Sequence, residues 1–429
     1  MFLTVSNYLR LSKKQYQIID TLCFLSKNMF NVGLYSINDH YSNNNEFLSY
    51  EENYHHCKEN ENYSLLHSDN AQQTLKVVNR SLNSFLGLLK QKKNGNYSAQ
   101  VNYPHYLRKN ARFPLIYPAR RSMIKNDSVV LGMSRQFKKE QGLNGKELTF
   151  RIPPQINPET ITEVRVIPIH GGKAYKIEYV YKIPDETVDL DNEQYLSIDL
   201  GLNNFATITE SVNGTATIIC GKYIKSINRY YNKKMSKLQA IKDKQGIKGI
   251  TNQQSRITIK RNNRIDEFLN RAIFHITQTC LENKIGNIVI GEMEGIKKEI
   301  NHGKRNNQNF VGIPYFLFKR KLKAKCERYG INYHEVNEAY TSRTDALAFD
   351  DIKEQPYGKK RRVKRGLFKS ITGVLINADV NGSLNIMRKV AGDIVVKQLA
   401  CSGLVNRPIR VKLAYEQHSY MPSTSVGGN

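Results

Sequence analysis

The spacing of hydrophobic residues changes once along the first 190 residues, from a helical to a strand-like pattern. Within about residues 13–95 apolar residues recur at every third or fourth position, which is typical of amphipathic helices. The clearest series is Leu75, Val78, Leu82, Phe85 and Leu89. From about 111 to 183, short apolar or alternating runs between Gly, Pro and Asn residues predict strands, and a further short strand begins the chain. Strands on both sides of a helical block predict a small β-barrel with helices inserted in one loop.

From about residue 194 the pattern predicts a mixed α/β domain. The segment 195–209 indicates a buried strand, a tight turn and a second strand, and a long helix follows over about 221–246. The later elements are a helix at about 257–284, a strand at 287–290, a helix at 314–330, a strand at 331–336 and a last helix that begins near Asp379. Strands that alternate with helices in this way are typical of α/β sheets.

The helix at 221–246 has one apolar and one basic face. The apolar face contains Ile224, Ile227, Tyr231, Leu238 and Ile241. The basic face contains Lys225, Arg229, Lys233 and Lys237. One basic face is explained equally well by exposure to water, but the whole chain has a net charge of +27 and a pI of about 9.7. Because cations that neutralise phosphates release condensed counterions, this charge favours a nucleic-acid partner and contact between this face and phosphates.

A dense basic run that follows an acidic patch lies within residues 343–369, inside the α/β region. Its cations are Lys359, Lys360, Arg361, Arg362, Lys364 and Arg365. A disordered loop would explain such a composition. The interior position of the run, with Tyr357, Leu367 and Phe368 in it, favours an ordered insertion that binds nucleic acid. The end of the chain, 396–429, is predicted to be a partly disordered tail.

Composition and cysteine usage exclude several classes of protein. No apolar run approaches the ~20 residues that cross a bilayer, and the first residues lack the pattern of a signal peptide. The six cysteines are scattered without a CxxC pair, which provides neither a disulfide framework nor a zinc site. We therefore expect a cytoplasmic protein without a membrane partner or structural zinc.

Carboxylates stand at the ends of predicted strands and at the start of the last helix. The residues are Asp199, Glu292, Glu338 and Asp379. Because sites in open α/β sheets form beyond the carboxyl ends of the strands, three such acids could hold two Mg²⁺ ions for phosphodiester cleavage. The local alternatives are a turn cap for Asp199 and a helix N-cap for Asp379.

Four sequence blocks resemble the TnpB (OrfB) proteins of bacterial insertion sequences. The blocks are SIDLGLNNFATI, NIVIG, NEAYTS and INADVNGSLNIMRK, and their spacing also matches over nearly the whole chain. The last block is the most specific. These proteins are RNA-guided nucleases with a RuvC-like domain of the ribonuclease-H fold, related to the type V CRISPR effectors. The resemblance implies that Asp199 and Asp379 are metal ligands.

The resemblance also implies a domain organisation and partners. We expect a wedge-like barrel at 1–12 and 106–190, a helical recognition domain at 13–105, a RuvC-like nuclease domain at 191–342 and 370–395, and the basic insertion at 343–369. A noncoding guide RNA from the transposon end is expected to pair with the target. The protein itself would recognise a short transposon-adjacent motif in double-stranded DNA. A monomer is favoured.

The sequence departs from the family pattern at two places. Most members carry the two CxxC pairs of a zinc ribbon after the NEAYTS block, whereas residues 343–369 contain no cysteine. We therefore expect packing alone to hold this insertion. The family's middle glutamate directly follows its apolar strand, where this chain has Gly291.

Two glutamates could supply the missing third ligand. Successive residues of a strand point to opposite faces, so Glu292 is expected to point away from the metals. Glu338 ends what should be the neighbouring strand and is favoured, with Glu292 as the alternative. Asn381 and Asn385 share roughly one helix face with Asp379 and are expected to orient the site.

Three functions remain as candidates. The favoured one is an Mg²⁺-dependent, RNA-guided DNA endonuclease in which Asp199, Glu338 and Asp379 bind metal and water is the nucleophile. The second is a guided repressor without nuclease activity, which Gly291 keeps open. The third is a transposase that itself joins DNA strands.

Overall fold

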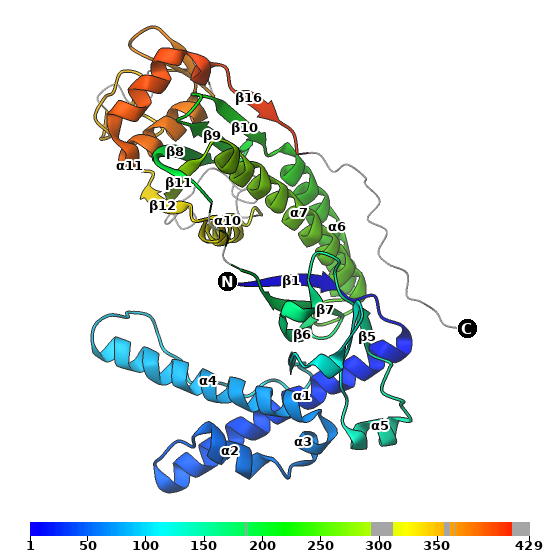
Figure 1. The fold of residues 1–429 in the computed structure, drawn as a ribbon. Helices are drawn as coiled ribbons and strands as arrows, with labels where there is room; N and C mark the ends of the chain where they lie inside the picture. The colour runs from blue at the N-terminus through cyan, green and yellow to red at the C-terminus, as the bar shows by residue number, and fades with distance from the viewer. Residues whose placement is uncertain (185, 187, 293–311, 356–360, 365, 414–429) are drawn as a thin grey trace. The chain divides into compact units, whose positions relative to one another are not determined.

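The computed structural model describes residues 1–184, 186, 188–292, 312–355, 361–364 and 366–413 (Figure 1). The chain divides into two compact units. Unit 1 consists of Met1–Pro184 with Ile250–Ser255, and unit 2 consists of Asp185–Gly249 with Arg256–Asn429.

Unit 1 contains two antiparallel sheets. The larger has the strand order β1-β7-β6-β2, and the smaller has the order β3-β4-β5. The larger sheet consists of β1 (Phe2–Tyr8), β2 (Leu115–Pro118), β6 (Ile161–Ile169) and β7 (Ala174–Lys182), and the smaller of β3 (Ile124–Lys125), β4 (Ser128–Val130) and β5 (Thr149–Arg151). The single small barrel remains a prediction, because the described strands belong to two separately hydrogen-bonded sheets.

Four helices lie in the chain between the first two strands of the larger sheet. They are α1 (Lys13–Asn44), α2 (Tyr50–Cys57), α3 (Glu61–Leu65) and α4 (Ser68–Lys93); α5 (Arg135–Gln141) follows later. Ser12 and Gln15 form a capping box at the start of α1, which fixes where this helix begins. Leu22 of α1 and Leu75 of α4 are fully buried in the same hydrophobic core as Tyr179 of β7. The helical spacing of the sequence therefore corresponds to a buried face.

Unit 2 contains a six-stranded mixed sheet with the order β12-β11-β8-β9-β10-β16. Its strands are β8 (Asp191–Leu200), β9 (Asn204–Glu210), β10 (Ala216–Cys220), β11 (Ile285–Glu292), β12 (Asn332–Asn337) and β16 (Ile409–Val411). β11 runs parallel to both β8 and β12, whereas β9 runs antiparallel to β8 and β10. The carboxyl ends of β8, β11 and β12 therefore lie together at one edge of the sheet.

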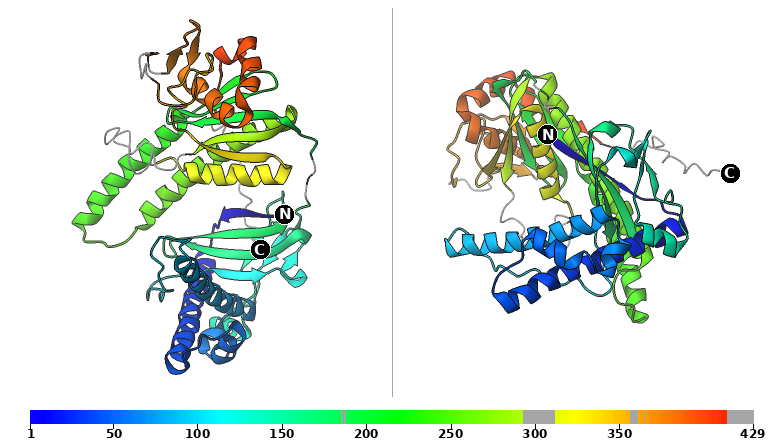
Figure 2. Two further views of the ribbon diagram at one scale, coloured as in Figure 1. Left: turned by 90° about the vertical axis from the view of Figure 1, so that its left-hand side faces the viewer. Right: turned by 60° about the horizontal axis from the view of Figure 1, so that its bottom comes forward.

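Helices cover both faces of this sheet (Figure 2). The helices are α6 (Lys222–Lys244), α7 (Asn252–Glu282), α10 (Tyr315–Tyr329) and α11 (Ala378–Ser402). The first three pack on one face, where Ile198 of β8 and Ile290 of β11 are buried against them. α11 packs on the other face. As the sequence predicts, Pro314 precedes α10, and Gly330 ends it in the left-handed conformation.

The predicted apolar face of α6 is correct only for the first half of the helix. Ile224 and Ile227 are buried, whereas Ile241 is exposed. The second half of the helix therefore carries apolar and basic residues alike at the surface. Helical spacing alone does not show how far along a helix its neighbours extend.

The basic insertion contributes the first two strands of a small antiparallel sheet, β13-β14-β15. Its strands are β13 (Arg362–Lys364), β14 (Leu367–Lys369) and β15 (Leu375–Asn377). The expectation that packing alone holds this segment is wrong. Asp345 is fully buried, and its Oδ2 atom accepts hydrogen bonds from Arg361 Nη1 at 2.7 Å and from the Ile371 amide at 2.9 Å. A buried ion pair therefore holds the insertion together with its apolar core.

We expect Asp345→Asn to destabilise the insertion by up to about 3 kcal/mol, because it leaves the largely buried Arg361 guanidinium with only the more distant of its two carboxylate partners, Asp350. Limited proteolysis within residues 343–369 measures the effect. Asp351→Asn is the control, since Asp351 and its partner Lys353 are both exposed. Equal proteolysis of the two variants would contradict a structural role for Asp345.

The predicted tail from residue 396 is partly wrong. α11 continues to Ser402, and residues 409–411 form β16, which pairs in parallel with β10 at the edge of the six-stranded sheet. Residues 414–429 lie outside the described part of the chain. Three short 3₁₀ helices complete the described structure: Arg121–Met123, Pro158–Thr160 and Leu404–Asn406.

None of the described helices combines the length and the hydrophobicity that a membrane span requires.

Candidate functional site

Asp199 lies at the carboxyl end of β8 and faces α11. Along β8, Leu196, Ile198 and Leu200 enter the core on the opposite face, so alternation turns Asp199 towards α11. A Cβ atom built on Gly382 of α11 would lie 2.7 Å from Asp199 Oδ2. Only glycine leaves this space for the carboxylate. The glycine of the VNG block is therefore explained by close approach to Asp199.

Asp379 stands in the first turn of α11, three residues before Gly382. Its Oδ2 atom accepts a hydrogen bond of 2.6 Å from Nδ2 of Asn204, the first residue of β9. Because residues three apart in a helix share a face, Asp379 and the carboxylate that packs on Gly382 are neighbours. The first block and the last block thus meet at one end of the sheet.

Buried hydroxyl groups fasten α11 to the strands beneath this site. Ser197 Oγ lies 2.6 Å from Thr209 Oγ1 and 2.9 Å from Ser383 Oγ, and it donates to the Ser383 carbonyl at 2.8 Å. All three residues are fully buried. Since Ser197 and Asp199 are two residues apart on one strand, this network fixes α11 directly beside the acid.

Glu338 comes from the residue that follows β12, and its side chain lies over Gly291. A Cβ atom built on Gly291 would come within 3.0 Å of three Glu338 side-chain atoms, closer than real Cβ atoms approach. Gly291 follows Ile290, which pairs with Ile198, the neighbour of Asp199. The Glu338 carboxylate therefore occupies the position of a side chain at 291, on the strand next to Asp199.

The Glu338 carboxyl group lacks the partners that a buried acid usually has. Its Oε1 atom is inaccessible to water and has no hydrogen-bond partner within the described structure. Burial raises the pKa of Glu338 to about 7, although Lys319 and Lys389 favour the charged form. A buried carboxylate oxygen that accepts no hydrogen bond is suited to ligate a cation.

Glu292 is the last residue of β11 and pairs with Asn337. Gly291 shares the α11 face with Asp199, so Glu292, one residue later, belongs to the opposite face. The geometry therefore favours Glu338 over Glu292 as the acid next to Asp199.

The surroundings of Asp199 disfavour the charged form of its carboxyl group. Burial raises the pKa of Asp199 well above its usual value, and the charges of Glu338 and Asp379 raise it further. The neighbouring carboxylates disfavour ionisation of Asp199, and a divalent cation bound between them would favour it. Within the described residues, no three acidic, histidine or cysteine side chains converge closely enough to form a complete ligand set for one ion. The donor types fit Mg²⁺, which prefers carboxylate oxygens and retains water ligands.

One cation and one phenol adjoin the acids. The positive charge of Arg362, from β13, lowers the pKa of Asp199, and Arg362 Nη2 donates to the Ser342 carbonyl at 3.3 Å. Tyr315, in the first turn of α10, donates from its hydroxyl to the Gly201 carbonyl at 2.8 Å. Burial, followed by the charges of Asp199 and Glu338, raises the Tyr315 pKa. The phenol is thus neutral and holds the turn after β8.

Asn381 and Asn385 do not orient the acids, contrary to the expectation. Asn381 Nδ2 donates to the Thr344 carbonyl at 2.7 Å, and Asn385 Nδ2 donates to the carbonyls of Thr341 and Thr344. Both side chains are fully buried. They bind the backbone of the segment after Glu338 to α11, a role that spacing along one helix cannot reveal.

The basic residues predicted to bind nucleic acid have different environments. On α6, Lys225 is half-buried, and Arg229, Lys233 and Lys237 are exposed. In the insertion, Arg362 and Lys364 are exposed, but Arg361 pairs with Asp345 and Asp350. The prediction for Arg361 is therefore corrected, because its charge is already neutralised inside the protein. Lys359, Lys360 and Arg365 lie outside the described residues.

Two family models match this chain. The OrfB_IS605 family, described as a probable transposase, matches residues 178–297. The Cas12f1-like TNB domain matches residues 315–386. The first match contains Asp199 and Glu292, and the second contains Glu338 and Asp379.

Individual proteins give a consistent result. The TnpB-like protein ORF457 of Acidianus two-tailed virus is 26% identical over 352 residues, which cover 76% of this chain and 74% of the viral protein. The solved complex of Cas12f1 with sgRNA and target DNA is 16% identical and has a TM-score of 0.56, with coverage of 87% of this chain and 83% of that chain. At this identity the similarity concerns the fold alone. A CRISPR-Cas12f ternary complex with a TM-score of 0.34 is too distant to add to it.

Proposed function

We propose that this chain, which is a TnpB-type protein related to the type V effectors, is a transposon-encoded RNA-guided endonuclease that cleaves double-stranded DNA. The observation that carries the proposal is the placement of three acids at one end of the unit 2 sheet, where the charges of Glu338 and Asp379 raise the pKa of Asp199. Asp199 packs on Gly382, Asp379 stands one helical turn away, and Glu338 fills the space over Gly291. Carboxylates at strand ends are the donors that Mg²⁺-dependent phosphodiester cleavage requires.

The acids would hold two Mg²⁺ ions through their carboxylate oxygens. Bound Mg²⁺ supplies an activated water and stabilises the leaving oxygen. The orphaned Oε1 atom of Glu338 supports its role as a ligand. Asn204 orients Asp379 by its hydrogen bond, and the buried Ser197–Ser383 contact keeps α11 in place.

Arg362 is the side chain best placed to bind the target phosphate. It is exposed, it lies close enough to lower the Asp199 pKa, and the small sheet holds its backbone. A guanidinium group matches two phosphate oxygens at once, which orients the phosphodiester towards the acids. The exposed cations of α6 and the insertion would bind the nucleic-acid backbones.

The partners follow from the relatives and from the charge. The solved Cas12f1 complex contains sgRNA and target DNA, and the net charge of +27 suits such partners. We propose a guide RNA encoded at the transposon end and a duplex DNA target with a short adjacent motif, which the protein reads. A monomer in the bacterial cytoplasm is the simplest form of this assembly.

A cleavage assay with co-purified RNA separates the candidate functions. The bound RNA is sequenced, and a matching duplex is incubated with the complex and Mg²⁺. We expect two cut strands. Tight binding without cleavage would identify a guided repressor. Joined transposon ends would identify a strand-joining transposase, which the family description "probable transposase" keeps as the second candidate.

Glu338→Gln should slow cleavage about 10²-fold or more, whereas Glu292→Gln should leave it within about twofold, because Glu338 adjoins Asp199 and Glu292 does not. Both changes keep the size of the side chain. Cleavage under single-turnover conditions gives the rates, and RNA binding verifies folding. An active Glu338→Gln protein beside an inactive Glu292→Gln protein would reverse the assignment of the third ligand.

A further inference from the structure

The turn between β8 and β9 holds two cations beside the acid site. Asn203 Oδ1 accepts a hydrogen bond from Lys225 Nζ at 2.6 Å, and Asn204 Oδ1 accepts one from Arg410 Nη1 at 3.3 Å. The Asn204 amide nitrogen donates to Asp379 Oδ2 at 2.6 Å. A single asparagine side chain therefore separates the Arg410 guanidinium from a carboxylate of the acid site.

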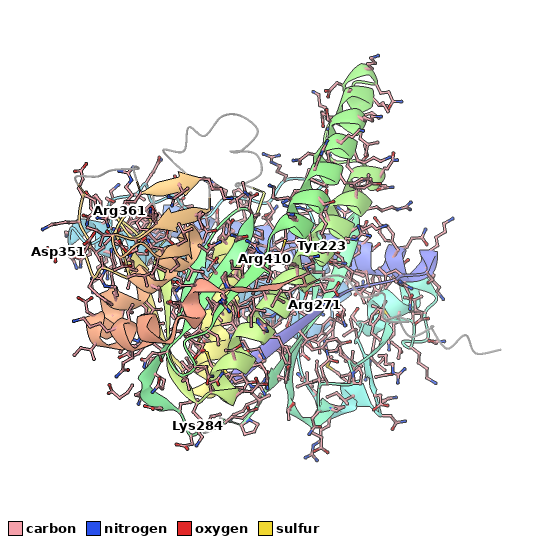
Figure 3. All side chains as sticks on the ribbon, turned by 90° about the horizontal axis from the view of Figure 1, so that it is seen from above. Tyr223, Arg271, Lys284, Asp351, Arg361 and Arg410 are labelled. Carbon is pink, nitrogen blue, oxygen red and sulfur yellow. The ribbon has the colours of Figure 1, made fainter. Side chains whose placement is uncertain are left out.

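The two cations come from distant segments that the sheet brings to this turn. Lys225 lies in the first turn of α6, which follows β10, and Arg410 lies in β16, which pairs with β10. Figure 3 marks Arg410 on β16 and Tyr223 at the start of α6. The Gly221 amide donates to the Asn203 carbonyl at 2.9 Å, which fixes the turn against the start of α6.

Both cations are held by neutral amide oxygens. An asparagine oxygen orients a cation as an aspartate would, but it does not neutralise the charge. Arg361 illustrates the contrast, since two carboxylates already neutralise it. In the described part of the chain, no carboxylate forms an ion pair with Lys225 or Arg410. Their charges thus remain available to an external anion, and Arg410 is exposed.

We propose that Lys225, Arg410 and the Asn203–Asn204 turn form a phosphate-binding site for the DNA strand that is cut. The inference rests on the proposed nuclease function. The three acids at the end of the sheet repel the negatively charged DNA strand. The two oriented cations near Asp379 would offset that repulsion where the DNA strand approaches the acids. The exposed cations of α6, from Arg229 to Lys237, extend the same face.

The site assigns a role to β16, because removal of this strand would remove Arg410. The cut strand would contact Arg362 from the insertion and Arg410 from the C-terminal segment. Arg362 precedes α11 in the chain and Arg410 follows it, and the two side chains would bind phosphates of the cut strand on either side of the acids. Lys225 and Arg410 would bind a phosphate adjacent to the scissile one, and the scissile phosphate itself would lie at the three acids.

Methylphosphonate interference tests the site. Full-length Asp199→Ala protein, loaded with its co-purified RNA, binds target DNA in which one phosphate at a time is replaced by a neutral methylphosphonate. The cut position is known from the products of the wild-type protein. We expect one or two replacements next to the cut to weaken binding about tenfold, as loss of a charge-assisted hydrogen bond does. In a Lys225→Gln/Arg410→Gln protein, the same replacements should have no further effect.

Two further variants distinguish a specific phosphate-binding site from non-specific electrostatic attraction of the DNA. Lys222→Gln/Lys412→Gln removes two exposed charges, one from the same helix turn as Lys225 and one directly after β16, and the sensitive phosphates should stay sensitive. Asn203→Asp keeps Lys225 but neutralises it, and should reduce the effect of the replacements. Unchanged sensitivity in Lys225→Gln/Arg410→Gln, or equal loss in the control protein, would overturn the inference. So would target DNA in which no replacement next to the cut weakens binding.

Failure of this site and failure of the proposed function give different results. If the wild-type complex never cuts, the nuclease proposal fails. If it cuts but the interference pattern does not depend on Lys225 and Arg410, only the phosphate site fails.

Discussion

Asp199→Ala and Asp379→Ala will each reduce DNA cleavage about 10³-fold or more while leaving guide-RNA binding at the wild-type level. Both carboxylates adjoin the first turn of α11, and Asp199 packs directly on Gly382. Loss of either removes a metal ligand, and several kcal/mol of transition-state stabilisation depend on the bound ions. Single-turnover cleavage and RNA binding by filter retention are the two measurements.

The control for this prediction is a change in charge without a change in shape. Asp199→Asn keeps the contact with Gly382 and the packing of β8, so its loss of activity reports on the negative charge. Asp351→Ala, an exposed acid in the insertion, should cut normally. If Asp199→Asn and Asp379→Asn proteins both cut at the wild-type rate, the acids are structural and the proposed mechanism is wrong.

Gly291→Ala will inactivate the enzyme almost as fully as loss of Glu338, about 10²-fold or more. A methyl group at 291 would occupy the space of the Glu338 side chain, which must then leave its place beside Asp199. The fold should survive, because alanine is accepted in a buried strand and Glu338 can turn towards solvent. Cleavage rate and thermal unfolding of the same samples separate the two effects.

A double-mutant cycle makes this prediction specific to the pair. Once Glu338 is alanine, Gly291→Ala should cost no further activity, because the obstructed carboxylate is gone. Gly291→Glu combined with Glu338→Gly should recover part of the activity, since it returns a carboxylate to the strand end next to Asp199. Additive losses in the cycle would show that Gly291 acts independently of Glu338.

Several parts of the site could be predicted from the sequence because they follow local rules. The apolar strands, their period of two and the rule that sites form at strand ends singled out Asp199, Glu292 and Glu338, and the start of the last helix added Asp379. Alternation along a strand also favoured Glu338 over Glu292, and the contact with Gly291 supports that choice. The helix ends at Pro314 and Gly330 followed from equally local signals.

Other features could not be predicted because their causes lie far away in the sequence. A basic run does not indicate which cation has an internal partner, so the Arg361–Asp345 ion pair was missed. Asn385 shares a helix face with Asp379, yet it bonds to backbone carbonyls of a segment more than forty residues away. β16 is three residues long and gains its strand conformation only by pairing with β10. Sequence patterns indicate periodic elements, whereas contacts between residues far apart in the sequence leave no periodic pattern.

The basic insertion contains a buried ion pair at the place where the family resemblance implies a zinc ribbon, and residues 343–369 contain neither cysteine nor histidine. Thiolate sites fail when zinc is scarce or when oxidants reach their sulfur atoms. A carboxylate–guanidinium pair has neither weakness. This part of the molecule should therefore keep its shape during metal starvation and oxidative stress, and peroxide or a zinc chelator should not open it.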